Sequence, residues 1–161
     1  MFHYKKIFAA LDGGSTQQAV VHRAINLAES NDAELLFGHV IDSVPYEANG
    51  IDFAALCEDG KARIEEALAP EFNYARRNEH IKNGELVVRA GRISDTLAEA
   101  LIKPFDPDLV ICGARGLSNL KYAFVGSVST YLIRHMDCDV LVVKPEQDEK
   151  RELEEQDWHS R

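Results

Sequence analysis

The chain has 161 residues, and its 27 acidic against 18 basic side chains give a formal net charge of −9. Its content of 45% hydrophobic and 28% charged residues is that of an ordinary soluble globular protein. A chain of this length forms one substantial core, which argues against an enzyme with a cleft between two domains. The acidic balance also argues against nucleic acid as a partner, because binding along phosphates needs a basic face.

Two features of the sequence indicate its compartment. No apolar run approaches the ~20 residues that span a bilayer, and the start of the chain has neither the apolar length nor the cleavage site of a signal peptide. The cysteines, Cys57, Cys112 and Cys138, show no CxxC spacing and suit a reducing environment better than a disulfide framework. We therefore expect a cytoplasmic protein with no membrane partner.

Five short apolar runs predict strands. Each run is nearly continuous rather than alternating, which is typical of strands buried on both faces in a parallel sheet. The runs cover residues 7–11, 35–41, 86–88, 109–112 and 140–143.

Two helical patterns lie between the first three runs. The first begins after Ser15 or Thr16, either of which can cap it, and its apolar residues recur at the spacing of one helix face. The second covers about residues 51–77, and we expect Gly60 and Pro70 to bend or break it.

Two further helices complete an alternating order of strands and helices. One covers about residues 93–103, with Ser94 as its cap and Pro104 as its end, and the other covers about residues 127–136. Because right-handed crossovers place successive helices on both faces of one sheet, the order predicts a single-domain α/β fold over residues 1–144.

The end of the chain differs in composition. Residues 145–161 hold seven acidic and three basic side chains, and their large apolar residues are Leu153 and Trp158. These are too few for a core, so we expect an acidic C-terminal tail that is solvated.

A glycine-rich segment follows the fourth apolar run. Gly113, Gly116 and Gly126-Ser127 form the pattern G-x2-G-x9-G-S, which begins where a strand ends and closes where a helix starts. Gly113 and Gly116 permit positive φ and a close approach of the main chain to a ligand. The first N–H groups of the helix lack intrahelical partners and attract phosphate, and the hydroxyls of Ser127 and Ser129 can add hydrogen bonds.

Two side chains near other strand ends extend this region. Asp12 follows the first strand and shares the edge of the sheet with the glycine segment if strands one and four are neighbours, where it could accept hydrogen bonds from a ribose or base. His39 lies near the carboxyl end of the second strand. It either reaches the rim of the same pocket or packs as an ordinary strand histidine.

Taken together, these segments resemble the universal stress protein family. The resemblance covers about residues 4–144 and rests on residues 6–13 (KIFAALDG), 113–116 (GARG), 125–129 (VGSVS) and 135–143 (HMDCDVLVV). In that family the glycine pattern marks the branch that binds ATP or another adenine nucleotide. The resemblance implies a Rossmann-like open sheet of five parallel strands in the order 3-2-1-4-5, with helices on both faces and a nucleotide across the ends of strands one and four.

The family's roles transfer to matching positions of this sequence. They imply base and ribose contacts at the ends of the first two strands, a ribose and phosphate side in the glycine loop, and phosphate contacts at the start of the last helix. The implied residues are Ala10, Leu11, Asp12, Val40, Gly113, Arg115, Gly116, Gly126, Ser127, Val128 and Ser129.

The resemblance also implies a dimer. In the order 3-2-1-4-5 the last strand, with Val140, Leu141, Val142 and Val143, forms an apolar edge, and pairing with a second copy would cover it.

The leading hypothesis is a cytoplasmic, homodimeric stress-response protein that binds ATP, ADP or AMP, with or without Mg²⁺, and acts as a sensor or regulator toward an unknown protein partner. Two alternatives stay open. The same pocket could serve a slow ATPase or nucleotide transferase, or the protein could be a partner-binding dimer without nucleotide.

Overall fold

The computed structural model describes residues 3–14, 16–48, 50–114 and 126–144. Its elements, in chain order, are β1 (Lys6–Leu11), α1 (Gln17–Asn31), β2 (Glu34–Asp42), η1 (Val44–Tyr46), α2 (Phe53–Ala67), α3 (Ala69–Arg77), β3 (Lys82–Gly91), α4 (Ile93–Thr96), η2 (Leu97–Ile102), α5 (Lys103–Phe105), β4 (Leu109–Gly113), α6 (Ser127–His135) and β5 (Asp139–Val143).

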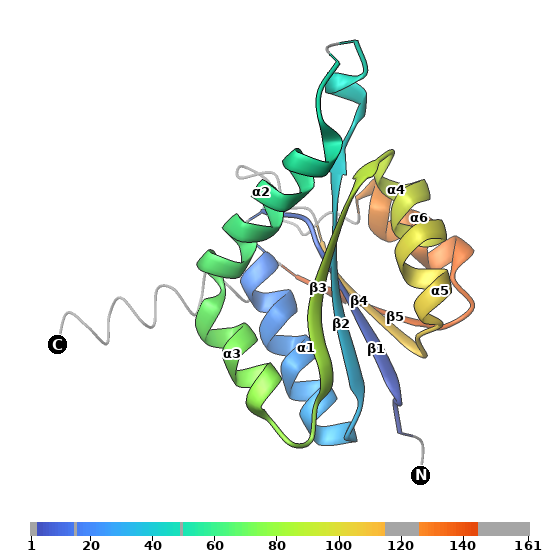
Figure 1. The fold of residues 1–161 in the computed structure, drawn as a ribbon. Coiled ribbons are helices and arrows are strands. Elements are labelled where there is room, and N and C mark those ends of the chain that lie inside the picture. The colour runs from blue at the N-terminus through green and yellow to red at the C-terminus, as the bar shows by residue number, and fades with distance from the viewer. Residues whose placement is uncertain (1–2, 15, 49, 115–125, 145–161) are drawn as a thin grey trace, which may run out of the picture.

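The strands form one five-stranded sheet in the order β3-β2-β1-β4-β5, as predicted (Figure 1). All four neighbouring pairs are parallel. β1 lies at the centre of the sheet. Its residues Ile7 to Leu11 are all buried, although their side chains alternate between the two faces. The nearly continuous apolar runs therefore reflect a sheet that helices cover on either side.

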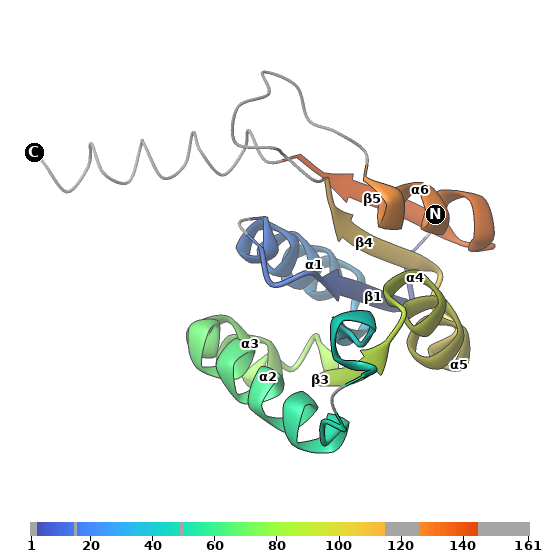
Figure 2. The ribbon, with the colours of Figure 1, turned by 90° about the horizontal axis from the view of Figure 1, so that it is seen from above.

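Helices form a layer on each face of the sheet (Figure 2). α1, α2 and α3 cover a core around Phe37, Phe72 and Ile111, whereas α4, η2, α5 and α6 cover a second core around Phe8 and Leu132. The predicted α/β architecture with helices on both faces is confirmed.

The second predicted helix is two helices. It breaks at Leu68, two residues before Pro70, and α3 begins at the next residue. Gly60 does not break α2: it lies within the helix and faces β2, where an added Cβ would be 2.9 Å from Ile41 Cδ1. A glycine at this position lets α2 approach the sheet closely, which compensates for its low helix propensity.

The third predicted helix is present with different ends. Its N-cap is Arg92 rather than Ser94, and its last helical residue is Phe105, one beyond Pro104. The π-helical η2 ends at Ile102, two residues before this proline. A widened turn leaves room for a proline ring whose bulk and missing N–H would otherwise disrupt the i→i−4 pattern.

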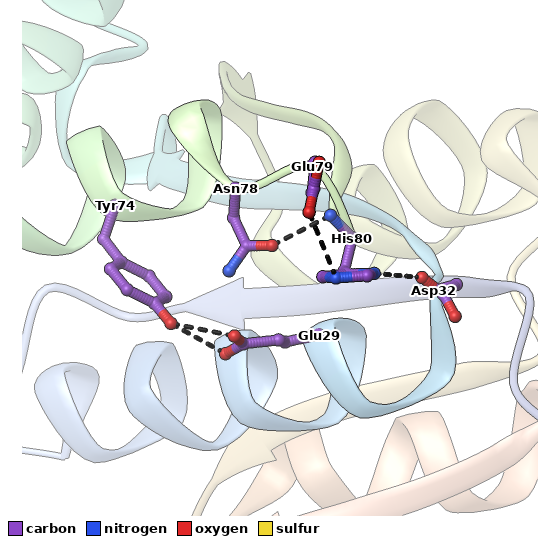
Figure 3. Close-up of polar contacts among 6 residues, drawn as sticks. All are labelled: Glu29, Asp32, Tyr74, Asn78, Glu79 and His80. Atoms are coloured by element: carbon purple, nitrogen blue, oxygen red, sulfur yellow. Dashed lines mark hydrogen bonds and ion pairs between the residues drawn. The ribbon is translucent and has the colours of Figure 1, made fainter.

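A polar cluster joins α1 to the chain between α3 and β3 (Figure 3). His80 Nδ1 lies 2.7 Å from Asp32 Oδ1, and its Nε2 lies 3.6 Å from Glu79 Oε1. Tyr74 donates to both carboxylate oxygens of Glu29 at 2.9 Å. The hydrogen bond to Asp32 raises the pKa of His80 above its ordinary value of 6.5.

This cluster makes the stability of the fold depend on pH. Because the pKa of His80 is raised in the folded chain, its pairing with Asp32 stabilises fully below pH 6.5 and is lost as the pH rises through the raised pKa. We expect His80→Gln to lower the free energy of unfolding in urea at pH 6 and to have little effect at pH 9. Asp32→Asn in the His80→Gln background should add no further pH dependence. If His80→Gln lowered the free energy of unfolding equally at pH 6 and pH 9, this pH dependence would be contradicted.

Candidate functional site

The candidate site lies where the order of the strands reverses. β1 pairs with β2 on one side and with β4 on the other. The helix after β1 packs on one face of the sheet, whereas α6, which follows β4, packs on the opposite face. The two connections diverge, so the carboxyl ends of β1 and β4 form a crevice of the kind that holds ligands in open α/β sheets.

A narrow cavity of about 70 Å³ occupies this crevice. One side is apolar, and the other is formed by the turn after β1, the end of β4 and the start of α6. The lining residues are Ala10, Leu11, Asp12, Val40, Ile93, Leu97, Cys112, Gly113, Gly126, Val128 and Ser129.

The turn after β1 fixes one oxygen of Asp12. The Gly14 N–H donates to Asp12 Oδ1 at 2.8 Å, and Gly13 between them has φ of 76°. This Asx turn explains the glycine at position 13, since positive φ is unfavourable for other residues. The Asp12 side chain is exposed, and Oδ2 takes no part in this bond.

Gly113 lies at the end of β4, but the positive φ predicted for it is wrong. The positive-φ glycines among the described residues are Gly13, Gly50 and Gly84, and Gly113 is not among them. An added Cβ at Gly113 would instead lie 2.4 Å from Thr16 Oγ1 and 3.1 Å from Thr16 Cβ. The close approach of α1 to β4 excludes a side chain here.

Main-chain donors lie at the start of α6. Gly126 is the N-cap and has no side chain to accept from the first turn, and the first helical bond runs from the Thr130 N–H to the Gly126 carbonyl at 3.0 Å. The N–H groups of the preceding three residues have no intrahelical acceptor. Ser127 is exposed beside them.

Ser129 is buried and engaged within the protein. Its hydroxyl donates to the Gly113 carbonyl at 3.2 Å and accepts from the Cys112 thiol at 3.6 Å. Burial raises the pKa of Cys112, so the thiol is protonated at neutral pH. The hydroxyl of Ser129 thus ties α6 to the end of β4, and its N–H group remains among those of the first helical turn.

The cavity therefore brings together nine of the residues that the sequence assigned to it: Ala10, Leu11, Asp12, Val40, Gly113, Gly126, Val128 and Ser129 line it, and Ser127 lies between two of them. Arg115 and Gly116 lie outside the described residues, as does the predicted tail at 145–161.

Sequence reasoning missed three lining residues, Ile93, Leu97 and Cys112. Ile93 and Leu97 belong to the helix that follows β3, and they pack in the second core, which also contains Phe8 of β1 and Val40 of β2. Both are apolar, but which apolar residues border a cavity depends on packing across the sheet and not on residue type.

Within the part of the chain that the structure describes, no three His, Cys, Asp or Glu side chains gather as metal ligands. No helix among the same residues is long and apolar enough to cross a membrane.

The fold and the position of the crevice define a doubly wound α/β protein of the kind that binds ligands at strand ends. The model of the universal stress protein family matches residues 3–144. Protein SSP1056 of Staphylococcus saprophyticus, which carries the universal stress protein name, is 33% identical over 147 residues, covering 91% of this chain and 87% of that protein. The chain belongs to the universal stress protein family.

Solved structures agree on the fold. The universal stress protein UspA from Lactobacillus plantarum superposes with a TM-score of 0.71 at 22% identity, covering 89% of this chain and 99% of that one. Protein MJ0577 superposes with a TM-score of 0.63 at 25% identity, covering 89% of this chain and 97% of that one. A universal stress protein in complex with cAMP superposes with a TM-score of 0.57 at 21% identity, covering 89% of this chain and 99% of that one.

The contact between Gly113 and α1 can be tested by substitution. Gly113→Ala should lower the free energy of unfolding by about 1–3 kcal/mol, because the added methyl group overlaps Thr16. The loss should shrink when Thr16→Ala removes the hydroxyl, giving a coupling in a double-mutant cycle of urea unfolding. Strictly additive losses would show that the close approach does not restrict this position.

Proposed function

We propose that this protein binds an adenine nucleotide, ATP, ADP or AMP with or without Mg²⁺, at the crevice between β1 and β4, and that it acts in the cytoplasm as a dimeric sensor or regulator toward a protein partner. The observation that carries the proposal is the set of main-chain N–H groups at the start of α6, which lies across a small cavity from the Asp12 turn.

The cavity is apolar on one side and has hydrogen-bonding groups on the other. A nucleotide likewise has a flat base at one end and polar ribose and phosphate groups at the other. Ala10, Val40 and Leu97 give an apolar surface on which a base can pack. Asp12 Oδ2 can accept hydrogen bonds from ribose hydroxyls. The donors of the first turn of α6 and the exposed hydroxyl of Ser127 suit phosphate oxygens, which are acceptors.

The size of the cavity sets a condition on binding. A volume of about 70 Å³ corresponds to a few water molecules. A nucleoside is larger than this volume, so the proposal requires that part of the ligand lies outside the cavity or that the cavity widens on binding. The proposal assigns the remaining predicted residues, Arg115 and Gly116, to the phosphate side of the ligand.

The comparisons support a nucleotide as the ligand class. The fold that this chain shares with the cAMP-bound universal stress protein accommodates a cyclic adenine nucleotide in that protein. The likeness concerns the fold, so the identity of the nucleotide and its phosphate number have to be measured on this chain.

The free edge of the sheet supports the dimer. Among the residues that the structure describes, β5 pairs with β4 alone, and its residues Val140, Leu141 and Val142 are only partly buried. An apolar edge strand has unpaired main-chain groups that a second copy can satisfy by strand pairing about a two-fold axis.

Nucleotide binding can be tested by calorimetric titration with ATP. We expect saturable binding, and about tenfold weaker binding by Asp12→Asn, which corresponds to about 1.4 kcal/mol. This variant keeps the oxygen that accepts from Gly14 while it removes the carboxylate charge. Asp106→Asn, at the opposite end of the sheet before β4, is the matched control and should bind as the wild type does. The absence of binding at millimolar ATP would refute the proposed function.

The dimer can be tested by sedimentation equilibrium at micromolar concentration. Val142→Lys places a charge on the free edge and should shift the protein toward monomer. Val44→Lys is the control, because Val44 is 51% exposed and lies in η1 after β2, away from β5. Circular dichroism verifies that both variants are folded. A wild-type protein that sediments as a monomer would overturn the dimer.

A further inference from the structure

A histidine of β2 is hydrogen-bonded to the end of β1. His39 Nδ1 lies 2.7 Å from the carbonyl oxygen of Leu11. A carbonyl oxygen can only accept, so the ring must carry its hydrogen on Nδ1 and donate it. Leu11 and His39 are also the last register partners of the β1–β2 pair, so the bond lies at the point where the ladder ends.

The same ring lies against the turn that follows β1. A Cβ built on Gly13 would be 3.7 Å from His39 Cε1, which is ordinary van der Waals contact. His39 therefore lies beside the main chain on both sides of Asp12: it is hydrogen-bonded to the carbonyl before it and faces the position of the glycine after it. The carboxylate between these points is held by the Gly14 N–H at 2.8 Å.

His39 does not line the cavity. Side chains alternate along a strand, so His39 shares the face of Phe37 and Ile41, which pack under α1, α2 and α3. Val40, the next residue, turns to the opposite face and lines the cavity. Any effect of the imidazole on a ligand therefore acts through the main chain of the turn.

We propose that His39 is a positioning residue of the nucleotide site. By donating from Nδ1 to the Leu11 carbonyl and filling the space beside Gly13, it fixes the turn at residues 12–14 and so directs the Asp12 carboxylate toward the ribose. The inference rests on the proposed function, because it gives His39 a part in binding a ligand there. It goes beyond that function because it assigns the orientation of Asp12 to a side chain on the face of the sheet opposite to the cavity.

Two substitutions separate this role from general packing. An Asn side chain places its amide nitrogen where His39 has Nδ1, whereas a Gln side chain places its nitrogen near the position of Nε2. Because the bond runs from Nδ1, His39→Asn should retain ATP affinity, and His39→Gln should weaken it about three- to tenfold, the range expected for one hydrogen bond. His80→Gln, at the opposite end of the sheet, is the control and should leave the affinity unchanged.

The pathway through Asp12 is tested by a double-mutant cycle. His39→Gln should cost little in the Asp12→Asn background, because the carboxylate that it orients is then gone. A second readout needs no nucleotide. In the unliganded protein, amide hydrogen exchange at Gly14 should be about three- to tenfold faster in His39→Gln than in the wild type and His39→Asn.

The outcomes distinguish the two levels of the proposal. If the wild type binds ATP but His39→Asn and His39→Gln bind equally, or their effects add to that of Asp12→Asn, the role of His39 is refuted while the proposed function stands. If the wild type binds no nucleotide, the proposed function fails. Gly14 exchange that is the same in all variants then also refutes the control of the turn by His39.

Discussion

The structure depends on the parallel pairing of β1 with both β2 and β4. This pairing puts the reversal of strand order next to the central strand, sends α1 and α6 to opposite faces and forms a crevice at the strand ends between them. The two cores, the small cavity and the apolar edge at β5 are all consequences of that arrangement.

The sequence predicted the sheet well because burial on both faces selects apolar side chains at every position of a strand. Each of the five predicted runs is a strand in the structure. Helix ends were harder to predict, since they depend on tertiary contacts. Gly60 continues a helix because Ile41 needs the space beneath it, and Pro104 is tolerated because a π-helical turn precedes it. Neither Ile41 nor η2 can be recognised from the residues around the glycine or the proline.

The positions of the glycines around the crevice were easier to predict than the side-chain contacts there. Glycines and an early-helix serine identify a loop and a helix start from local sequence, so Gly113 and Gly126 were placed correctly. The reason for Gly113 lies in Thr16, which is far away in the sequence. The engagement of Ser129 with Gly113, and of His39 with Leu11, likewise joins residues of different elements. Contacts of this kind follow from the fold and not from a local pattern.

A protein of net charge −9 should repel an anionic ligand, but the repulsion depends on how far the charges lie from the site. Exposed charges farther apart than a Debye length of about 8–10 Å are largely screened at physiological ionic strength. Hydrogen-bond donors at the start of α6 would touch the ligand directly, so their interaction is not screened in this way. The bonds that Leu11 and Gly113 carbonyls accept from His39 and Ser129 act in the same direction. They engage two carbonyl oxygens at the strand ends, whose lone pairs are then less available to repel phosphate, while the Asp12 carboxylate belongs to the proposed ribose side.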